Sequence, residues 1–571
     1  MFKHKISLVV LILLCFSCVL WNGFAGDDHA LFGNNSFYKN SSNIVRIFRS
    51  GYNVIPDEVL YGHSPDKGTG SVAYRPMTTM SFFFDCLGWD NRPFGYHLTS
   101  LVLHLANVLL LYQIVALLST PLVALSAAII FAIHPANTEP VAAIGYRSDL
   151  LACFFLLIAF QSWLYFRKKI TALWAILAYT AYFLALFSKE TALFFPLVIV
   201  FFDRTILGLE AKVIKQRPYW PFFFISFFYL YVYFFVFQNT GFIRNFAVGY
   251  GWQEYMSVFV QIVALYLKEI CFVLSAGVMP PLYWPLPRPW LSVDMIGLAF
   301  LVVTLMASMI ILIMRRTKVS WAALWVCVFF LPALVYWVNP NPVALRYMYI
   351  PFVGIAFLMA TLLVYWGRVW GGRLSAGMRY FLCSAAIVSL LLPAITSNLV
   401  WRSNFSLGEA WVKAYPEHHM GYFFKGTEFF RLKKYQEAVD NFLLALKDPG
   451  CDATLSNYYL GVCYLQLGRL DDGKAAFERI FNKVPLSYYG QLGMADYYYA
   501  IKQYPVSVTY LERILPSHYT DELAINFLLA LEHAEGTGGV TRGLKIIGSI
   551  LGDGPRLDKI IQLSKRGLKL R

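Results

Sequence analysis

The stretch ISLVVLILLCFSCVLW, residues 6–21, is an uncharged apolar run that NGFAGDD, residues 22–28, follows directly. Its length approaches the roughly 20 residues that a membrane-spanning helix needs. The basic residues before it would also suit a signal peptide, but no clear small-x-small cleavage site follows. We therefore expect a retained first membrane helix. It would present two adjacent carboxylates, Asp27 and Asp28, to water at its exit, where a charge costs least.

The composition indicates that this first run is one of many. Of the 571 residues, 58% are hydrophobic and only 14% are charged, whereas soluble domains carry about 25% charged residues. The formal net charge of +15 would suggest nucleic acid as a partner if the protein were soluble. Here much of the excess lies in short loops between apolar runs, where basic residues set membrane topology. We expect a multi-pass membrane protein that lies in a lipid bilayer and binds no nucleic acid.

Twelve apolar runs are candidates for membrane helices. They are residues 6–24, 97–118, 121–134, 149–166, 171–187, 191–207, 218–237, 257–278, 294–314, 320–338, 348–366 and 379–398. With a cytoplasmic N-terminus, every basic cluster falls inside only if 257–278 does not cross. Lys268 and Glu269 in the middle of this run also suit an interfacial helix. We predict about eleven transmembrane helices plus one interfacial or re-entrant helix, with residues after 400 outside.

A sequence repeat appears after Arg402, where the composition becomes that of a soluble helical protein. Gly426 and Phe442 recur 35 residues later as Gly461 and Phe477, and a looser third copy follows. A period near 34 with small residues where helices cross is typical of tetratricopeptide repeats. The sequence therefore predicts a C-terminal tetratricopeptide α-solenoid on the same side of the membrane as Asp27 and Asp28.

The chain as a whole is predicted to be all-α. We expect a transmembrane domain at 1–402 that contains a first external loop at 25–96. A repeat domain is expected at 417–535, and a basic C-terminal helix or tail at 536–571.

Polar residues beside the apolar runs are candidates for a functional site, because such residues are costly near lipid. They group as Tyr74-Arg75-Pro76 to Asn107, His134 to Asp149, Ser188-Lys189-Glu190, Leu345-Arg346-Tyr347 and Asp203-Arg204. All but the last group share a side with Asp27 and Asp28 in the predicted topology. Each also has a structural reading, as an ion pair, a helix end or a hydrogen bond between helices. His97 and His104, which share a helix face, could instead bind a metal.

The order of these motifs resembles the TMTC-type protein O-mannosyltransferases, which are multispanning enzymes with luminal tetratricopeptide repeats. The matching pieces are Asp27-Asp28, Tyr74-Arg75-Pro76, Tyr96-His97 with His104 and Asn107, His134-Pro135 with Thr138-Glu139, Arg147-Ser148-Asp149-Leu150-Leu151, Ser188-Lys189-Glu190, and Arg346-Tyr347 with Pro351. The resemblance implies a GT-C glycosyltransferase fold and a polyprenyl-phosphate-linked sugar as donor. The chain departs from the family in having only about three recognisable repeats. Its retained first helix, its Lys3-His4-Lys5 start and its short loops would suit a bacterial homologue in the inner membrane, with its active site and repeats facing the periplasm.

Sugar transfer assigns a role to each of these residues. Attack on the anomeric carbon needs a base for the acceptor hydroxyl, and we predict Asp28 as this base with Asp27 beside it. Cations hold the leaving phosphate, which arginine suits well. The predicted donor-binding residues are Arg75, His97, Arg147, Lys189, Arg346 and Tyr347. The predicted orienting residues are Glu139, Asp149, Glu190 and His104. A direct displacement would invert the anomeric centre.

Several alternatives remain open at the level of sequence. The repeats favour a protein or peptide acceptor held in their groove, with mannose as the sugar if the resemblance extends that far. The other readings are a transferase acting on lipid A or another envelope glycan, a flippase, and a non-enzymatic scaffold that presents the repeats. No cofactor is certain, although Asp27, Asp28 and Glu139 could hold a divalent metal ion if they converge.

Overall fold

The computed structural model is helical, and the part of the chain that it describes contains no strand. The described residues are 2–33, 38, 41–49, 73–169, 171–208, 217–236, 252–271, 289, 292–335, 344–370, 373–448, 451, 453–485, 487–515 and 521–551. These residues form two compact units, of which the first ends at Ser406 and the second begins at Leu407.

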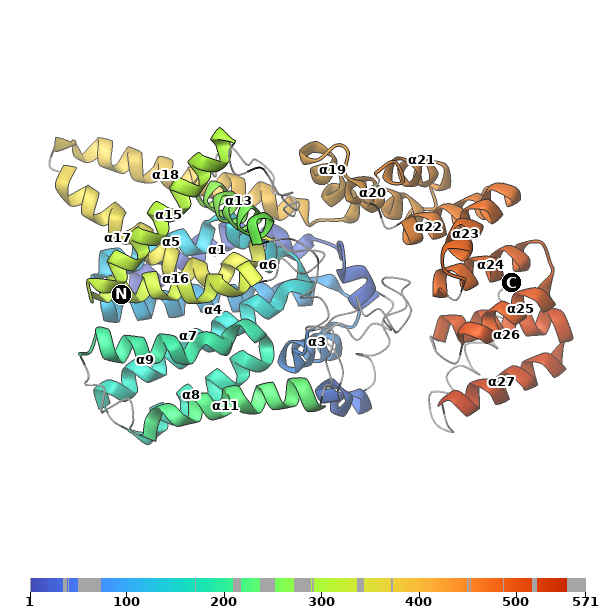
Figure 1. Cartoon of the computed structure of the whole chain (residues 1–571), viewed down its shortest axis with the longest axis horizontal. Coiled ribbons are helices and arrows are strands. Elements are labelled where there is room, and N and C mark those ends of the chain that lie inside the picture. Colours follow the sequence, from blue (N-terminus) through green and yellow to red (C-terminus); the bar gives the residue numbers. More distant parts are fainter. Residues whose placement is uncertain are drawn as a thin grey trace. The chain divides into compact units, whose positions relative to one another are not determined.

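The first unit is a bundle of apolar helices (Figure 1). Its α-helices are α1 (Phe2–Phe16), α3 (Pro76–Trp89), α4 (Pro93–Leu118), α5 (Pro121–Ile133), α6 (Thr138–Ala142), α7 (Arg147–Lys169), α8 (Ala172–Ser188), α9 (Phe195–Thr205), α11 (Trp220–Tyr231), α13 (Trp252–Cys271), α15 (Val293–Met314), α16 (Lys318–Val335), α17 (Tyr349–Trp370) and α18 (Ala376–Val400). Short 3-10 turns that matter below are η1 (Ser17–Trp21), η5 (Pro135–Asn137), η6 (Ile144–Tyr146), η7 (Glu190–Phe194), η8 (Arg217–Tyr219) and η12 (Leu345–Met348). Proline opens α3, α4 and α5, where its missing N–H costs nothing.

Within the described residues, six helices are long and apolar enough to cross a membrane, or seven if the bent pair described below is one span. This confirms the predicted multi-pass membrane protein. The six helices are Lys3–Trp21, Pro93–Leu118, Ile144–Lys169, Val293–Met314, Leu345–Trp370 and Ala376–Val400. The other five predicted crossings correspond to shorter helices: α8, the α11 segment, α16, α9, and α5. Helix α5 is followed by a break and a bend of 58° into residues 135–142, as in a broken span or a re-entrant loop.

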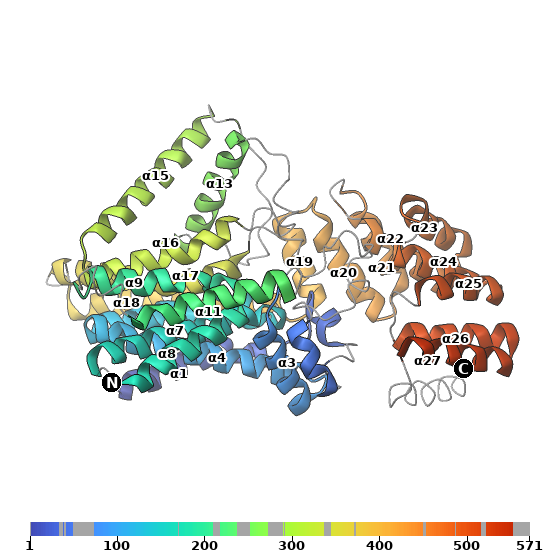
Figure 2. The same ribbon diagram turned by 60° about the horizontal axis from the view of Figure 1, so that its bottom comes forward.

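Helix α13 and its neighbour α15 differ from the rest of the bundle. Helix α13 does not qualify as a span, in keeping with the expectation of an interfacial or re-entrant helix there. It packs against α15 through Val260, Met295 and Val302, and only 6% of the apolar window of α15 is buried. Figure 2 shows both helices leaning away from the other helices of this unit. Most of the surface of α15 is thus not covered by the described residues of the chain.

Charged residues gather at the two ends of the bundle, which α7 connects. Arg147 begins this helix and Arg167 lies near its end, and 20 residues of helix rise about 30 Å, close to the thickness of a bilayer core. At the Arg167 end, the buried Asp203 carboxylate accepts hydrogen bonds from Arg167, Trp163 and Tyr219. Asp203, read from the sequence as part of a helix end, therefore ties α7, α9 and η8 together.

The second unit is a series of antiparallel helix pairs. Its helices are α19 (Asn404–Ala414, which starts in the first unit), α20 (His419–Arg431), α21 (Tyr435–Ala445), α22 (Ala453–Gln466), α23 (Leu470–Lys483), α24 (Tyr488–Ala500), α25 (Tyr504–Ile514), α26 (Asp521–Glu535) and α27 (Thr537–Leu551). From α20 on, each helix packs against the next, which is consistent with the predicted solenoid.

The repeat positions lie where the helices of a pair cross. A Cβ on Gly426 would come within 2.7 Å of the Phe442 ring, and one on Gly461 within 2.4 Å of the Phe477 ring. Only glycine allows this approach, so the small-residue and aromatic positions of the repeat are explained by packing. The basic segment predicted at 536–571 begins with α27, which pairs with α26. Its residues 552–571 lie outside the described part of the chain.

Candidate active site

The segment that carries the acid pair is fastened to the end of α18. The Asn22 side chain donates a hydrogen bond to the Asn398 carbonyl over 3.0 Å. The backbone N–H of Gly23 donates to the Arg402 carbonyl over 3.0 Å. These bonds join the end of the first span to the end of the last one, and they fix where residues 27 and 28 lie.

Asp28 is buried and is held by the backbone of η6. Its Oδ2 accepts from the Ile144 N–H over 3.1 Å, and its Oδ1 accepts from the Gly145 N–H over 2.7 Å. A Cβ on Gly145 would lie 3.1 Å from Asp28 Oδ1 and 3.1 Å from Leu31, so glycine permits this approach. Burial raises the pKa of Asp28 to about 7, and the Asp27 charge adds to this against the two N–H groups.

Asp27 differs from its neighbour in being exposed. The protein around it nevertheless raises the pKa of its carboxyl by desolvation, while the Arg346 charge and a hydrogen bond from the Tyr146 side chain act in the opposite direction. Of the two carboxylates, Asp27 is therefore the one that can reach another molecule, and Asp28 is the one that is fixed.

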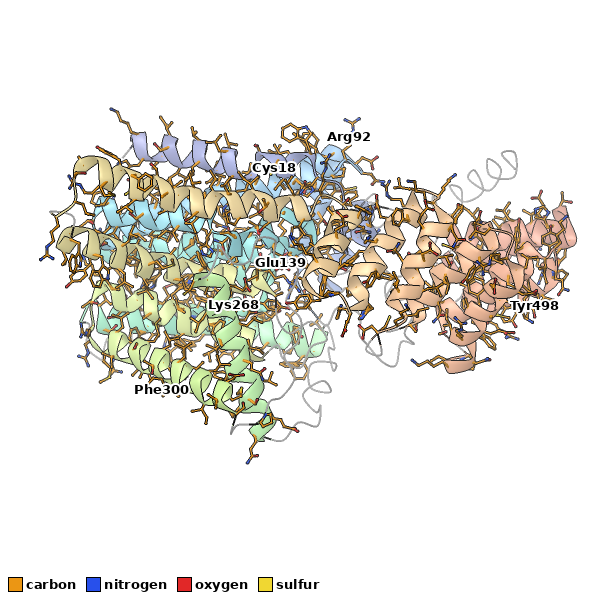
Figure 3. All side chains as sticks on the ribbon, turned by 90° about the horizontal axis from the view of Figure 1, so that it is seen from above. Cys18, Arg92, Glu139, Lys268, Phe300 and Tyr498 are labelled. Carbon is orange, nitrogen blue, oxygen red and sulfur yellow. The ribbon has the colours of Figure 1, made fainter. Side chains whose placement is uncertain are left out.

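Arg346 is the cation whose charge lowers the pKa of Asp27, and Glu139 holds the Arg346 side chain in place. The Arg346 Nη1 forms an ion pair with Glu139 Oε1, and the backbone N–H of Arg346 donates to Glu139 Oε2 over 2.9 Å. The guanidinium carbon lies 3.9 Å from the centre of the Tyr146 ring, a cation–π contact. The Arg346 side chain keeps 12% of its surface exposed, while that of Glu139 keeps 5%. In Figure 3, Glu139 lies among the helices of this unit.

Tyr347 lies between two cations. Its ring centre is 5.0 Å from the Arg346 guanidinium carbon and 5.2 Å from Lys189 Nζ. Lys189 forms an ion pair with Asp149 over 2.6 Å, and both side chains are almost fully buried. Two buried charges of this kind are tolerated only because they are paired.

Arg75 and Glu190 form a further pair that is partly exposed. Arg75 Nη2 and Nε donate to the two Glu190 carboxylate oxygens over 2.6 and 2.9 Å. Arg75 also donates to the Ser148 hydroxyl over 3.3 Å. This fork geometry joins α3 to η7 and to the start of α7.

Arg147, which the sequence suggested as a donor ligand, lies in the protein interior. Its guanidinium pairs with Asp85 over 2.5 Å and donates to the Tyr96 carbonyl over 2.8 Å. The residue is fully buried. Its contacts are those of a residue that joins α3, α4 and α7.

The two predicted histidines are also buried. His97 Nε2 lies 3.3 Å from the Gly23 carbonyl, in the segment that leads to the acid pair. His104 Nδ1 lies 2.8 Å from the Tyr349 hydroxyl and its Nε2 lies 3.1 Å from the Ala132 carbonyl. Both nitrogens of His104 are engaged, so the structure explains it as a link between helices.

The predicted site residues thus meet at one end of the bundle and divide by accessibility. Those with exposed or partly exposed side chains are Asp27, Arg75, Glu190, Arg346 and Tyr347. Those that are buried are Asp28, His97, His104, Glu139, Arg147, Asp149 and Lys189.

The ion pairs among the described residues at this end of the bundle do not include Asp27 and Asp28. Each of the four cations predicted as site residues forms an ion pair with its own acid; the pairs are Arg75–Glu190, Arg147–Asp85, Lys189–Asp149 and Arg346–Glu139. Asp27 and Asp28 form no ion pair with any residue that the structure describes.

The acids do not form the metal site that the sequence left open. Among the described residues, the group of three whose ligand atoms lie within 4.8 Å of one another is His418, His419 and Asp448 in the second unit. Asp28 instead faces backbone amides, and Glu139 faces Arg346, so the two acids point to different partners. In the second unit, His419 Nδ1 is 2.7 Å from Asp448, and His418 Nδ1 accepts from the Met420 N–H. These bonds already anchor the start of α20, and no cofactor is established.

Tyr146 is a site residue that the sequence reasoning missed. The Arg346 guanidinium carbon lies 3.9 Å from the centre of the Tyr146 ring, and the Tyr146 side chain acts to lower the pKa of Asp27. The available signal was its position directly before the Arg147-Ser148-Asp149 motif, where an aromatic residue lies beside a dense polar cluster.

Comparison with known proteins supports one family, although no family model matches the chain. The chain is 26% identical over 162 residues, 28% of its length, to "Protein O-mannosyl-transferase TMTC3" of Mus musculus. It is 36% identical over 124 residues, 21% of its length, to "Protein O-mannosyl-transferase Tmtc1" of Drosophila melanogaster. It is 24% identical over 233 residues, 37% of its length, to "Protein O-mannosyl-transferase TMTC4" of Mus musculus.

These matches cover 17%, 14% and 29% of the relatives' own lengths, so the chain spans less than a third of each of these curated relatives. The same family name recurs in matches from mouse, human, fly and worm proteins. The resemblance that the order of the motifs predicts is thereby confirmed: over part of its length the chain is similar to proteins named as TMTC-type protein O-mannosyltransferases.

Proposed function

We propose that this protein is a membrane glycosyltransferase that moves a sugar from a polyprenyl-phosphate donor to a protein hydroxyl on the non-cytoplasmic side. The observation that carries the proposal is the unpaired carboxylate couple Asp27–Asp28 beside the fixed cation Arg346. An exposed base next to a phosphate-binding cation is what transfer from a phosphate-linked sugar requires. The related proteins are named protein O-mannosyl-transferases, which supports mannose as the sugar.

Asp27 is the base in this proposal, in place of the Asp28 named from the sequence. Its exposure favours contact with an acceptor, whereas both oxygens of Asp28 already accept backbone hydrogen bonds. Asp28 would act as a fixed neighbouring charge that keeps the proton affinity of the couple high. A raised pKa makes a carboxylate a better base near neutral pH.

The proposed step is a direct displacement. Asp27 takes the proton of the acceptor hydroxyl while that oxygen bonds to the anomeric carbon. The bond from this carbon to the phosphate oxygen breaks, its electron pair leaves with the polyprenyl phosphate, and the anomeric centre inverts. Arg346 stabilises the departing charge, because Glu139 engages only part of its guanidinium and further N–H donors remain. Arg75 and Tyr347, also partly exposed, would complete the donor site.

The acceptor is proposed to be a protein or peptide. Stacked helix pairs such as those from α20 to α27 commonly present extended surfaces that bind peptides. The alternative acceptors are lipid A and other envelope glycans. A scaffold that only presents the repeats would not need four buried or half-buried ion pairs around an exposed acid. A location in a bacterial inner membrane, with the repeats in the periplasm, is part of this proposal.

A reconstituted transfer assay tests the proposal. The purified protein in lipid vesicles is given radiolabelled polyprenyl-phosphate mannose together with either a pool of secreted-protein peptides or lipid A. We expect label in the peptides, as a mannosyl group that alkali releases from serine or threonine by β-elimination and whose anomeric configuration is inverted. Label in lipid A would change the acceptor class. Label that only crosses the vesicle membrane, with no transfer, would contradict the enzyme and support a flippase.

A further inference from the structure

Helix α13 contacts both chain segments that carry the Arg346–Glu139 pair. The Tyr266 hydroxyl donates to the Ala344 carbonyl over 3.0 Å and accepts from the Ala344 N–H over 3.2 Å. Ala344 precedes Arg346 by two residues at the start of η12. The Tyr266 hydroxyl therefore binds both the N–H and the carbonyl of Ala344, the residue at which the segment that carries Arg346 begins.

The same helix contacts the segment of Glu139 one turn further on. His134 Nε2 donates to the Ile270 carbonyl over 3.2 Å, and its Nδ1 accepts from the Ala136 N–H over 3.2 Å. His134 is fully buried and stands at the 58° bend that leads into α6, which carries Glu139. Tyr266 and Ile270 are four residues apart and so lie on one face of α13.

Helix α13 therefore holds two chain segments. Its Tyr266 hydroxyl fixes the backbone before Arg346, and its Ile270 carbonyl fixes the bend before Glu139. Glu139 joins the two segments by its bonds to Arg346. The Tyr266 side chain is buried and packs its ring edge-on against Phe330 at 5.5 Å. Helix α13 otherwise packs against α15, most of whose surface is not covered by protein. The label of Lys268 marks α13 in Figure 3.

We propose that α13 acts as a clamp, which keeps Arg346 paired with Glu139 and placed to bind the donor phosphate. The Tyr266 hydroxyl is the positioning group of this clamp. The inference rests on the proposed function, because it assigns the donor phosphate to Arg346. Tyr266 touches neither donor nor acceptor in this account and acts only through Arg346. Its loss should therefore affect donor use and leave acceptor use unchanged.

The variant Tyr266→Phe tests the clamp, because it removes the hydroxyl and keeps the ring that packs on Phe330. The control is Tyr182→Phe. Tyr182 is equally buried, and its hydroxyl bonds to Ser226 over 2.7 Å in another part of the bundle. We expect Tyr266→Phe, which removes both hydrogen bonds between the hydroxyl and Ala344, to lower kcat/KM for the donor about five- to tenfold. The acceptor KM and the Tm should match those of Tyr182→Phe.

A double-mutant cycle separates positioning from a general structural role. In an Arg346→Lys background, Tyr266→Phe should cost less than about twofold, because the group it positions has already been changed. An equal loss in both backgrounds, or no loss in the wild-type background, would overturn the clamp.

Failure of the proposed function would look different from failure of the clamp. If the wild type transfers no sugar at all, the enzyme assignment fails. The clamp is then decided by binding of an unglycosylated polyprenyl phosphate, measured as a rise in Tm in detergent. Tyr266→Phe should weaken this binding about five- to tenfold, and unchanged binding would refute the clamp.

Discussion

Glu139 holds Arg346 at two points, because one carboxylate oxygen pairs with the guanidinium and the other accepts from the backbone N–H of the same residue. The side chain and the main chain of the cation are thus fixed together. A site that must stabilise charge in a transition state gains from such fixed groups, since they need not reorganise during the reaction.

The first prediction concerns this contact. Glu139→Gln keeps an acceptor for the Arg346 N–H but removes the charge that orients the guanidinium. Charge-assisted hydrogen bonds contribute roughly 1.5–3 kcal/mol, so kcat/KM for the donor should fall about 10- to 100-fold. The matched control is Glu428→Gln in the second unit, where Glu428 pairs with Arg431 over 2.6 Å. Equal rates for the two variants would show that Glu139 has no part in transfer.

The second prediction concerns Gly145. Alanine here would place a Cβ 3.1 Å from both Asp28 Oδ1 and the Leu31 side chain, so the acid segment must shift by a few tenths of an ångström. Because reacting groups tolerate little misplacement, we expect Gly145→Ala to lower kcat at least tenfold with little change in Tm. Gly297→Ala, at a position with open space around it, should leave kcat unchanged. A wild-type kcat in Gly145→Ala would mean that the position of Asp28 does not matter.

The third prediction concerns pH. The pKa of Asp28 is raised to about 7 and that of Asp27 is also raised, and two neighbouring carboxyls titrate as a pair. A base must be unprotonated, so the rate should fall as the pH drops through the raised pKa of Asp27, by up to tenfold per unit. The test is kcat/KM from pH 5 to 9. A flat profile over this range would exclude a carboxyl of raised pKa as the base.

The same titration also affects stability. The folded protein binds the Asp28 proton more tightly than the unfolded chain does, so this group favours folding at low pH. Its contribution is lost as the pH rises from about 4, the ordinary value, to about 7. Asp28→Asn cannot titrate, so the wild type should lose several degrees of Tm relative to Asp28→Asn between pH 5 and 8. A Tm difference that does not depend on pH would argue against the raised pKa.

The fourth prediction concerns the buried pair Lys189–Asp149. Asp149→Asn would leave the Lys189 charge buried without its partner, which costs about 3–5 kcal/mol, and the Tm should fall clearly. Replacing both residues, as in Asp149→Leu with Lys189→Met, should restore most of this stability. The exposed pair Arg469–Asp472 supplies the control, since Asp472→Asn should cost less than about 1 kcal/mol. A small loss in Asp149→Asn would show that Lys189 is solvated or neutral.

The fold and the end of the bundle that holds the site follow from local features of the sequence. Asp28, Glu139 and Arg346 each lie directly beside an apolar run. The run places such a residue at a helix end, and the positions of the basic loops predict which side of the membrane that end faces. The repeat positions behave likewise, because Gly426 and Phe442 recur at a fixed spacing that only a helix pair explains.

The pairing within the site depends on contacts that the sequence does not display. Glu139 and Arg346 are 207 residues apart, and nothing local indicates that they meet. The same holds for Arg147, which pairs with Asp85 in the interior although its motif suggested a donor ligand. Asp27 and Asp28 are chemically alike, and only the amides of η6 make one fixed and the other exposed.

The most direct test of the account is the rate of sugar transfer by Asp27→Asn, measured with radiolabelled polyprenyl-phosphate mannose and a peptide acceptor. Asn matches the shape of the carboxylate but accepts no proton, so transfer should fall at least 1,000-fold while the Tm and the binding of polyprenyl phosphate stay at wild-type values. Asp28→Asn should retain more activity than Asp27→Asn. Transfer at the wild-type rate by Asp27→Asn would contradict the assignment of Asp27 as the base.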